Sequence, residues 1–150
     1  MKPLRKFEEF VKEGIIIKRT ADINRAKSLV EEVNKRKKFL SELREKIGLS
    51  DKNANYFIEN AYDILIELIR AKLILDGFKS SGVSAHEAEV SYLRNLDFIE
   101  SNIRFMNELR YFRNGIKYYG KSFDKETALK VLDFLDKTYP LLKKKIDIKE

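Results

Sequence analysis

A run of apolar residues with helical spacing between positions 54 and 76 constrains the fold of this chain more than any other feature. Large apolar side chains recur at intervals of one, three and four from Tyr56 to Leu75, with only isolated charges between them. A helix that is apolar on two sides has to be covered on both of them. The segment therefore predicts the central helix of a helical bundle, beginning after Asp51 and ending at Gly77.

The rest of the chain supplies helices that would cover this central one. Their apolar residues also recur every three or four positions, and Pro140 should kink or end the last of them. No segment shows the alternation of apolar and polar residues that is typical of a half-buried strand. We therefore expect one all-α domain over residues 1–150, an up-and-down bundle of five or six helices. The further helices are expected at residues 3–13, 22–47, 84–96, 97–119 and 124–140.

Several local signals refine these boundaries. Asp22 and Asp124 are suitable N-caps, and Asp97 is a third candidate. Ser84 and Glu87 have the spacing of a capping box, in which each side chain satisfies a free backbone amide of the other residue. The β-branched residues 15–17 could form a strand, but we favour a buried connector because no second strand is evident in the sequence.

Composition limits the chemistry. The formal net charge of +7 indicates either a polyanionic partner or a lysine-rich surface without a specific role. There is no cysteine, and His86 is the only histidine, so neither a thiolate nor a multi-histidine metal site can form. We expect a structural role for His86, and we expect no metal and no cofactor. Glu59 and Asp63 could share a divalent ion or a proton, but such pairs are more often solvated.

Membrane insertion is not expected. No apolar run approaches the roughly 18 residues that a spanning helix needs. The first ten residues carry charges and do not resemble the apolar core of a signal peptide. We therefore expect a cytoplasmic location and no membrane partner.

The segment from Glu108 to Gly120 is the strongest candidate for function. At 100° per residue, its apolar side chains share one helix face, and a second row contains Asn107, Tyr111, Asn114 and Tyr118. Arg110, Arg113 and Lys117 lie between this row and the apolar face. Cations beside tyrosines and amides could bind phosphate groups and stack bases. The same row could also be a dimer interface, or only the solvent-exposed edge of a helix.

Gly115 lies inside this helix, where glycine costs about 1 kcal/mol relative to alanine. Arg113 and Tyr118 would point well apart on a straight helix. We interpret the glycine as a position at which the end of the helix bends, so that these two side chains can converge on one site.

Three features of the sequence resemble the HEPN superfamily, an all-α domain associated with nucleotide binding. Residues 59–62 open a long apolar helix that ends at Gly77, and a loop with Ser84 and His86 follows. Arg113–Asn114 lies late in the penultimate long helix, where the family has an arginine, a polar residue and, a few positions on, a histidine. The resemblance covers roughly residues 20–140. It implies a four-helix core and a homodimer.

The resemblance also implies where function would lie. In many members the arginine and histidine form a metal-independent ribonuclease site in the dimer cleft, but here Tyr118 stands at the histidine position. We therefore expect a homodimer that binds RNA or a nucleotide, and the resemblance also suggests a small nucleotidyltransferase as its partner in a toxin–antitoxin-like module. One alternative is a ribonuclease with Arg113 and Tyr118 as catalytic residues, and another is a non-catalytic interaction subunit. The expected binding residues are Arg110, Arg113, Asn114, Lys117, Tyr118 and Tyr119.

Overall fold

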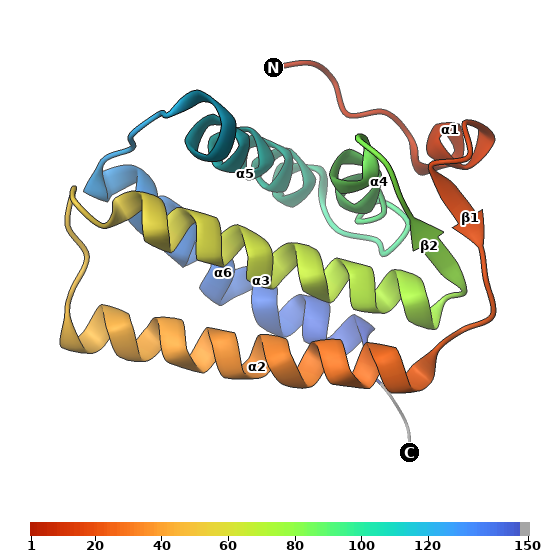
Figure 1. Cartoon of the computed structure of the whole chain (residues 1–150), viewed down its shortest axis with the longest axis horizontal. Helices are drawn as coiled ribbons and strands as arrows, with labels where there is room; N and C mark the ends of the chain where they lie inside the picture. Colours follow the sequence, from red (N-terminus) through yellow and green to blue (C-terminus); the bar gives the residue numbers. More distant parts are fainter. Residues whose placement is uncertain (148–150) are drawn as a thin grey trace.

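A computed structural model describes residues 1–147 of the chain. Four long helices run side by side with alternating direction, and two short helices and a small sheet lie at one end (Figure 1). This arrangement confirms the expected all-α bundle. The helices are α1 (Phe7–Lys12), α2 (Ile23–Lys46), α3 (Ala54–Leu75), α4 (Ala85–Ser91), α5 (Glu100–Tyr119) and α6 (Lys125–Lys145). The strands are β1 (Ile16–Lys18) and β2 (Phe78–Ser80).

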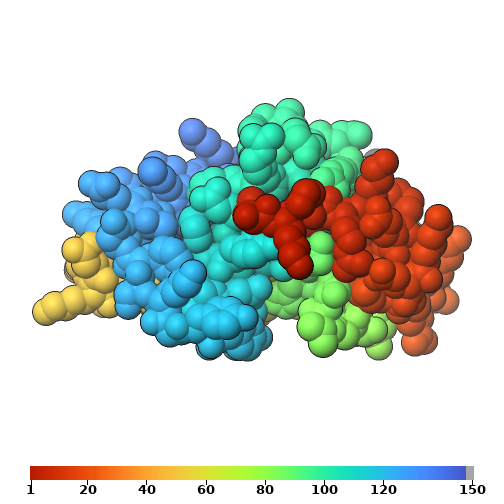
Figure 2. Space-filling view, turned by 90° about the horizontal axis from the view of Figure 1, so that it is seen from above, coloured from red at the N-terminus to blue at the C-terminus, as the bar shows by residue number. Residues whose placement is uncertain are grey.

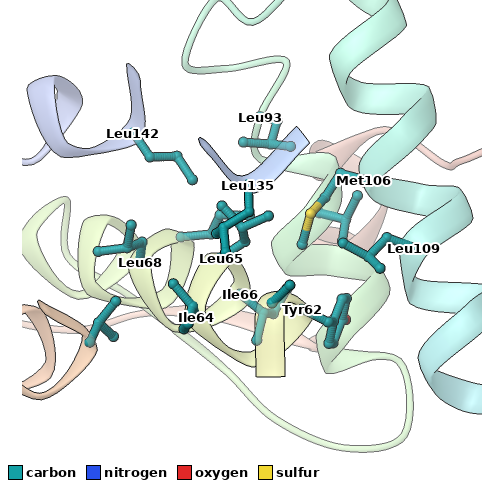
Figure 3. Packing of buried hydrophobic residues seen from close by; sticks show 14 of the residues in the cluster. Tyr62, Ile64, Leu65, Ile66, Leu68, Leu93, Met106, Leu109, Leu135 and Leu142 are labelled. Carbon is teal, nitrogen blue, oxygen red and sulfur yellow. The ribbon is translucent and has the colours of Figure 1, made fainter. Parts of the chain in front are cut away.

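Helix α3 is the centre of the core, as its apolar pattern predicts. It contacts α2, α6, α5 and α4, so it is covered from several sides. Its side chains interdigitate with those of Met106 and Leu109 from α5 and of Leu135 and Leu142 from α6 (Figure 3). More than half of the residues of α3 are buried, and α3 contributes more buried residues to the core than any other helix of the bundle. None of the helices that the structure describes is long and apolar enough to cross a membrane.

The expectation of a connector at residues 15–17 is wrong. Ile16 to Lys18 form β1, which pairs antiparallel with β2 so that Ile17 lies opposite Lys79. The partner strand begins directly after Gly77, about sixty residues further along the chain. Sequence reasoning missed the pair because each strand has only three residues, too few to show an alternating pattern.

The first helix begins later than predicted, at Phe7 instead of Pro3. Residues 1–6 run as an irregular segment along the bundle. Arg94 holds this segment, because its two terminal nitrogens donate to the carbonyl oxygens of Arg5 at 2.9 Å and Leu4 at 3.1 Å. The donor to these backbone carbonyls thus comes from a distant part of the chain, and no local sequence pattern predicts this contact.

The N-caps are partly as predicted. Asp22 and Asp124 each accept a hydrogen bond from the backbone amide three residues on. The capping box is wrong, because Ser84 makes no side-chain cap bond and Glu87 instead accepts from Arg5 at 3.4 Å. Asp97 lies in a turn with φ of 63°, and α5 starts after Ile99 without a side-chain cap.

The fourth and sixth helices end at other residues than predicted. Helix α4 stops at Ser91, and the next residues form turns in which Leu96 remains buried. Helix α6 continues through Pro140 to Lys145. The carbonyl that loses its partner belongs to Asp136, four residues earlier, where the helix is exposed and water can bind it.

A buried ion pair fixes α4 against the rest of the bundle. Glu89 on α4 is fully buried and accepts from Arg70 Nε at 2.7 Å, from Arg70 Nη2 at 3.1 Å and from Ser80 Oγ at 2.9 Å. The three residues come from α4, α3 and β2. Since His86 lies one turn earlier on α4, the same contacts also determine where its side chain lies.

Candidate nucleic-acid interface on α5

The candidate site is the face of α5 that carries Arg110, Arg113 and Lys117. The buried residues Met106 and Leu109 lie one turn before Arg110 and Arg113 on the same side of the helix, and they anchor it in the core. Both arginines are half-buried, whereas Lys117 is exposed. The helix therefore presents three cations from one rigid element whose position is set by the core.

Arg113 brings together residues that are separated in sequence. Its Cζ atom lies 5.7 Å from the ring centroid of Tyr62 on α3 and 6.0 Å from that of Tyr118 on α5. Its Nη1 atom also makes a long hydrogen bond of 3.4 Å to Asn114. Arg113, Asn114 and Tyr118 thus form one cluster, as the sequence predicts. The guanidinium lies between two aromatic rings, an arrangement that restricts its motion and favours a fixed charge.

The two other cations extend this cluster along the helix. Arg110 donates from Nε to Asn107 Oδ1 at 3.1 Å, and its Cζ lies 4.9 Å from the Tyr111 ring centroid. The Nζ atom of Lys117 lies 5.9 Å from the Tyr118 ring centroid. Tyr118 therefore lies within 6.0 Å of two cations. Tyrosine and cation alternate on this surface, as a base-stacking and phosphate-binding site requires.

The charges of these cations are not neutralised by the protein. Within residues 1–147, no carboxylate forms a salt bridge with Arg110, Arg113 or Lys117. By contrast, Arg36 pairs with Glu67 at 3.1 Å and Arg70 pairs with Glu89. Unpaired cations on one face produce a local positive potential that attracts anions.

Tyr119 is the one expected residue that the structure does not bring into the cluster. Its side chain is 77% exposed, and in the described part of the chain it makes no hydrogen bond or ring contact. Tyr118, at 64% exposure, also presents most of its ring to solvent, but it remains in contact with Arg113. Both phenols are thus accessible to a ligand or to a partner surface.

Gly115 is explained by packing at the end of α5. The helix stops at Gly120, whose φ of 64° is left-handed, and the amide of Lys121 returns to the carbonyl of Gly115 at 3.0 Å. A Cβ atom at position 115 would lie 3.0 Å from the Cδ atom of Lys121. The side chain of Lys121 therefore packs over the glycine. Helix α5 is continuous to Tyr119, and Arg113 approaches Tyr118 within it.

Tyr62 and His86 border the site, and sequence reasoning assigned neither of them to it. The hydroxyl of Tyr62 lies 2.9 Å from His86 Nδ1, and the two rings stack with centroids 5.7 Å apart. Because Tyr62 also contacts Arg113, it links the histidine of α4 to the cation of α5. The only signal in the sequence was that Tyr62 and His86 both belong to the segments that resemble the HEPN family.

The protonation of this pair follows from burial. Burial lowers the pKa of His86, an effect that the charges of Arg113 and Arg70 strengthen and that of Glu89 opposes. Burial likewise raises the pKa of Tyr62 above its ordinary value. Both groups are therefore neutral near pH 7, and Arg113 carries the positive charge at this point.

Glu59 and Asp63 lie on α3, the helix that carries Tyr62. In the part of the chain that the structure describes, no group of three or more histidine, aspartate or glutamate side chains is placed to hold a metal ion. Asp63 acts at a distance instead, since its charge raises the pKa values of His86 and Tyr62 as a minor contribution.

Comparisons of the chain with models of protein families, with curated proteins and with solved structures give no match.

Proposed function

We propose that this protein binds RNA or a nucleotide through the face of α5, in the manner that the resemblance to HEPN domains implies. One observation carries the proposal: three cations without a carboxylate partner surround exposed tyrosine rings on one rigid helix. Arg110, Arg113 and Lys117 would contact phosphates, and Tyr118 would stack on a base. The net charge of +7 supports the same conclusion.

The test replaces Arg113 with alanine and measures binding of a labelled single-stranded RNA at several salt concentrations. Each phosphate contact to a single strand contributes about 0.7 to the slope of log K against log salt. The variant should lower this slope by about 0.7 and weaken binding about fourfold at 0.15 M salt. The helical circular dichroism should not change, because Arg113 makes no salt bridge within residues 1–147.

Arg36→Ala is the matched control. It removes the same charge from α2, where Arg36 pairs with Glu67, and it should leave RNA affinity within twofold of wild type. If Arg113→Ala and Arg36→Ala bind RNA equally well, the α5 face is not the binding surface.

A homodimer is part of the proposal. Tyr118 and Tyr119 are exposed aromatic residues, a type enriched at interfaces between proteins, and they lie at the end of α5 where two copies could pair. A cytoplasmic location and a small nucleotidyltransferase partner belong to the same proposal. Light scattering measures the mass in solution, and a monomer at all accessible concentrations would contradict the dimer.

A non-catalytic interaction subunit would bind its partner with little dependence on salt, whereas RNA binding weakens steeply as salt rises.

A ribonuclease is the second candidate, and the approach of Arg113 to Tyr118 supports it. Arg113 would stabilise the negative charge that develops on the non-bridging oxygens of the scissile phosphate, and the Tyr118 hydroxyl would donate a proton. This reaction needs no metal, so cleavage of RNA should persist in EDTA and be lost in Tyr118→Phe. If no RNA in a broad panel is cut, binding without cleavage is the remaining function.

A further inference from the structure

The N-terminal segment and α5 border an open hollow of about 310 Å³ that the proposed function does not use. Figure 2 shows the first residues, in dark red, lying across the teal surface of α5. We propose that this hollow is a subsite for one nucleotide unit of a single-stranded RNA. The inference rests on the proposed function and names the form of nucleic acid that the same face of α5 would take. The side chains that carry the argument are those of Pro3, Leu4, Ile103, Arg104 and Asn107.

Asn107 provides the first observation, a hydrogen-bond donor without a partner. Its side chain is only 3% exposed, and its Oδ1 atom accepts from Arg110 Nε. This contact fixes the orientation of the amide, since an arginine nitrogen can only donate. Within residues 1–147, Nδ2 donates no hydrogen bond. Since no fully buried side-chain nitrogen or oxygen there lacks a partner, Nδ2 is not fully buried. Because Asn107 lines the hollow, we place the small solvent contact of Nδ2 there.

The walls of the hollow suit a flat, partly apolar group. Pro3 and Leu4 form one side, and Ile103 of α5 forms another. The segment that carries Leu4 is fixed, because Arg94 donates to the carbonyls of Leu4 and Arg5. A nucleobase can bury its ring between such side chains and accept a hydrogen bond from Nδ2 through a carbonyl oxygen or a ring nitrogen. The volume lies within the range of small-ligand pockets.

The charges around the hollow suit the phosphate of the same unit. Lys2 and Arg104 line it, and neither has an ion-pair partner in the described part of the chain. Glu100 also lines the hollow, but its carboxylate forms an ion pair with Arg94 at 3.7 Å. The remaining charge in the hollow is therefore positive.

The hollow is continuous with the cations of the proposed interface. The side chain of Asn107 accepts a hydrogen bond from Arg110, and Arg113 lies one turn further along α5. At 1.5 Å and 100° per residue, Arg104 and Arg113 are about 14 Å apart along the helix axis and lie on opposite sides of it. Steps of three residues from Arg104 through Asn107 and Arg110 form a ridge that winds around the helix to Arg113. A single strand can follow this ridge and turn one base into the hollow. A duplex cannot, because its bases are stacked and paired inside the helix.

The experiment compares two ligands of similar charge: a labelled single-stranded RNA of about 12 nucleotides and an inorganic polyphosphate, which has no bases. Asn107→Asp retains the acceptor for Arg110 but replaces the donor Nδ2 with an oxygen. Asn102→Asp makes the same change in charge on α5 outside the hollow, and it is the matched control. Thermal melting checks that both variants are folded.

Asn107→Asp should weaken RNA binding about tenfold relative to Asn102→Asp, the loss of one well-made hydrogen bond. Polyphosphate binding should weaken by a smaller factor than RNA binding in Asn107→Asp, since the new carboxylate lies against Arg110 but no base contact is lost. If Asn107→Asp, relative to Asn102→Asp, weakens the binding of RNA and of polyphosphate by the same factor, the hollow takes no base. This result would overturn the inference, although the α5 interface stands. If the wild-type protein binds neither ligand, the proposed function fails as well.

A second measurement requires no substitution, so it remains decisive if Asn107→Asp does not fold. The side-chain amide signals of Asn107 are followed by NMR while uridine 5′-monophosphate or inorganic phosphate is added to the wild-type protein. We expect these signals to shift with the nucleotide and not with phosphate. Equal shifts with both ligands, or none with either, would overturn the inference.

Discussion

Replacing Glu89 with glutamine tests the argument that a buried ion pair fixes α4. Glu89 accepts three hydrogen bonds, two from Arg70 and one from Ser80. Glutamine has nearly the same shape but no charge, and in either orientation its NH₂ group has to face a nitrogen donor of Arg70, because each carboxylate oxygen of Glu89 accepts from Arg70. The variant therefore leaves a buried donor unsatisfied and removes the anion that balances Arg70.

The magnitude follows from the burial of the two partners. Breaking a buried ion pair by removing one partner costs about 3–5 kcal/mol. Glu89 is fully buried, but the side chain of Arg70 is 31% exposed, so water can partly solvate the guanidinium that remains. We therefore expect a loss near the lower limit, about 3 kcal/mol. For a domain of this size, this loss lowers the melting temperature by about 6–12 °C.

The assay is chemical denaturation of the wild type, Glu89→Gln and Glu87→Gln. Glu87 is the matched control on the same helix, because its contact with Arg5 is long, at 3.4 Å, and partly exposed. Its loss should cost less than about 1 kcal/mol. The double variant Arg70→Met with Glu89→Gln should recover part of the stability, since no unpaired charge remains. If Glu89→Gln is no less stable than Glu87→Gln, the ion pair does not hold α4.

Three further results are expected. Gly77→Ala should lose about 2 kcal/mol or more in denaturation, because φ is +83° and the new Cβ would lie 2.9 Å from the carbonyl oxygen of Arg19. Gly115→Ala should not lose stability, since its Cβ would meet only the flexible side chain of Lys121 and the helix would gain. The free energy of unfolding should also fall as the pH drops below about 6.5, because the folded state lowers the pKa of His86 and the unfolded state binds the proton first. His86→Gln should remove this part of the pH dependence, and an unchanged pH profile in that variant would refute the assignment.

The sequence by itself determined the class of fold and the order of the helices. The apolar pattern of α3 predicted a central helix, and this element is the most buried of the bundle. Such a pattern is informative because a long helix repeats its burial every three or four residues, so many positions agree. The sequence also indicated Arg113, Asn114 and Tyr118 as one site, but the approach of Arg113 to Tyr118 does not follow from helix spacing alone, because residues five apart lie on different faces of a helix.

Only the tertiary structure decided which distant residues meet. The pairing of β1 with β2, the capture of the N-terminal segment by Arg94 and the contact of Tyr62 with His86 join segments that are 24 to 90 residues apart. No local pattern encodes these contacts, because each depends on a few side chains that the packing of the bundle brings within reach. The hollow beside Asn107 belongs to the same class, since its walls come from the N-terminal segment and from α5. The sequence thus predicted which helix carries the candidate site, whereas the packing of the bundle determined which residues lie next to that helix.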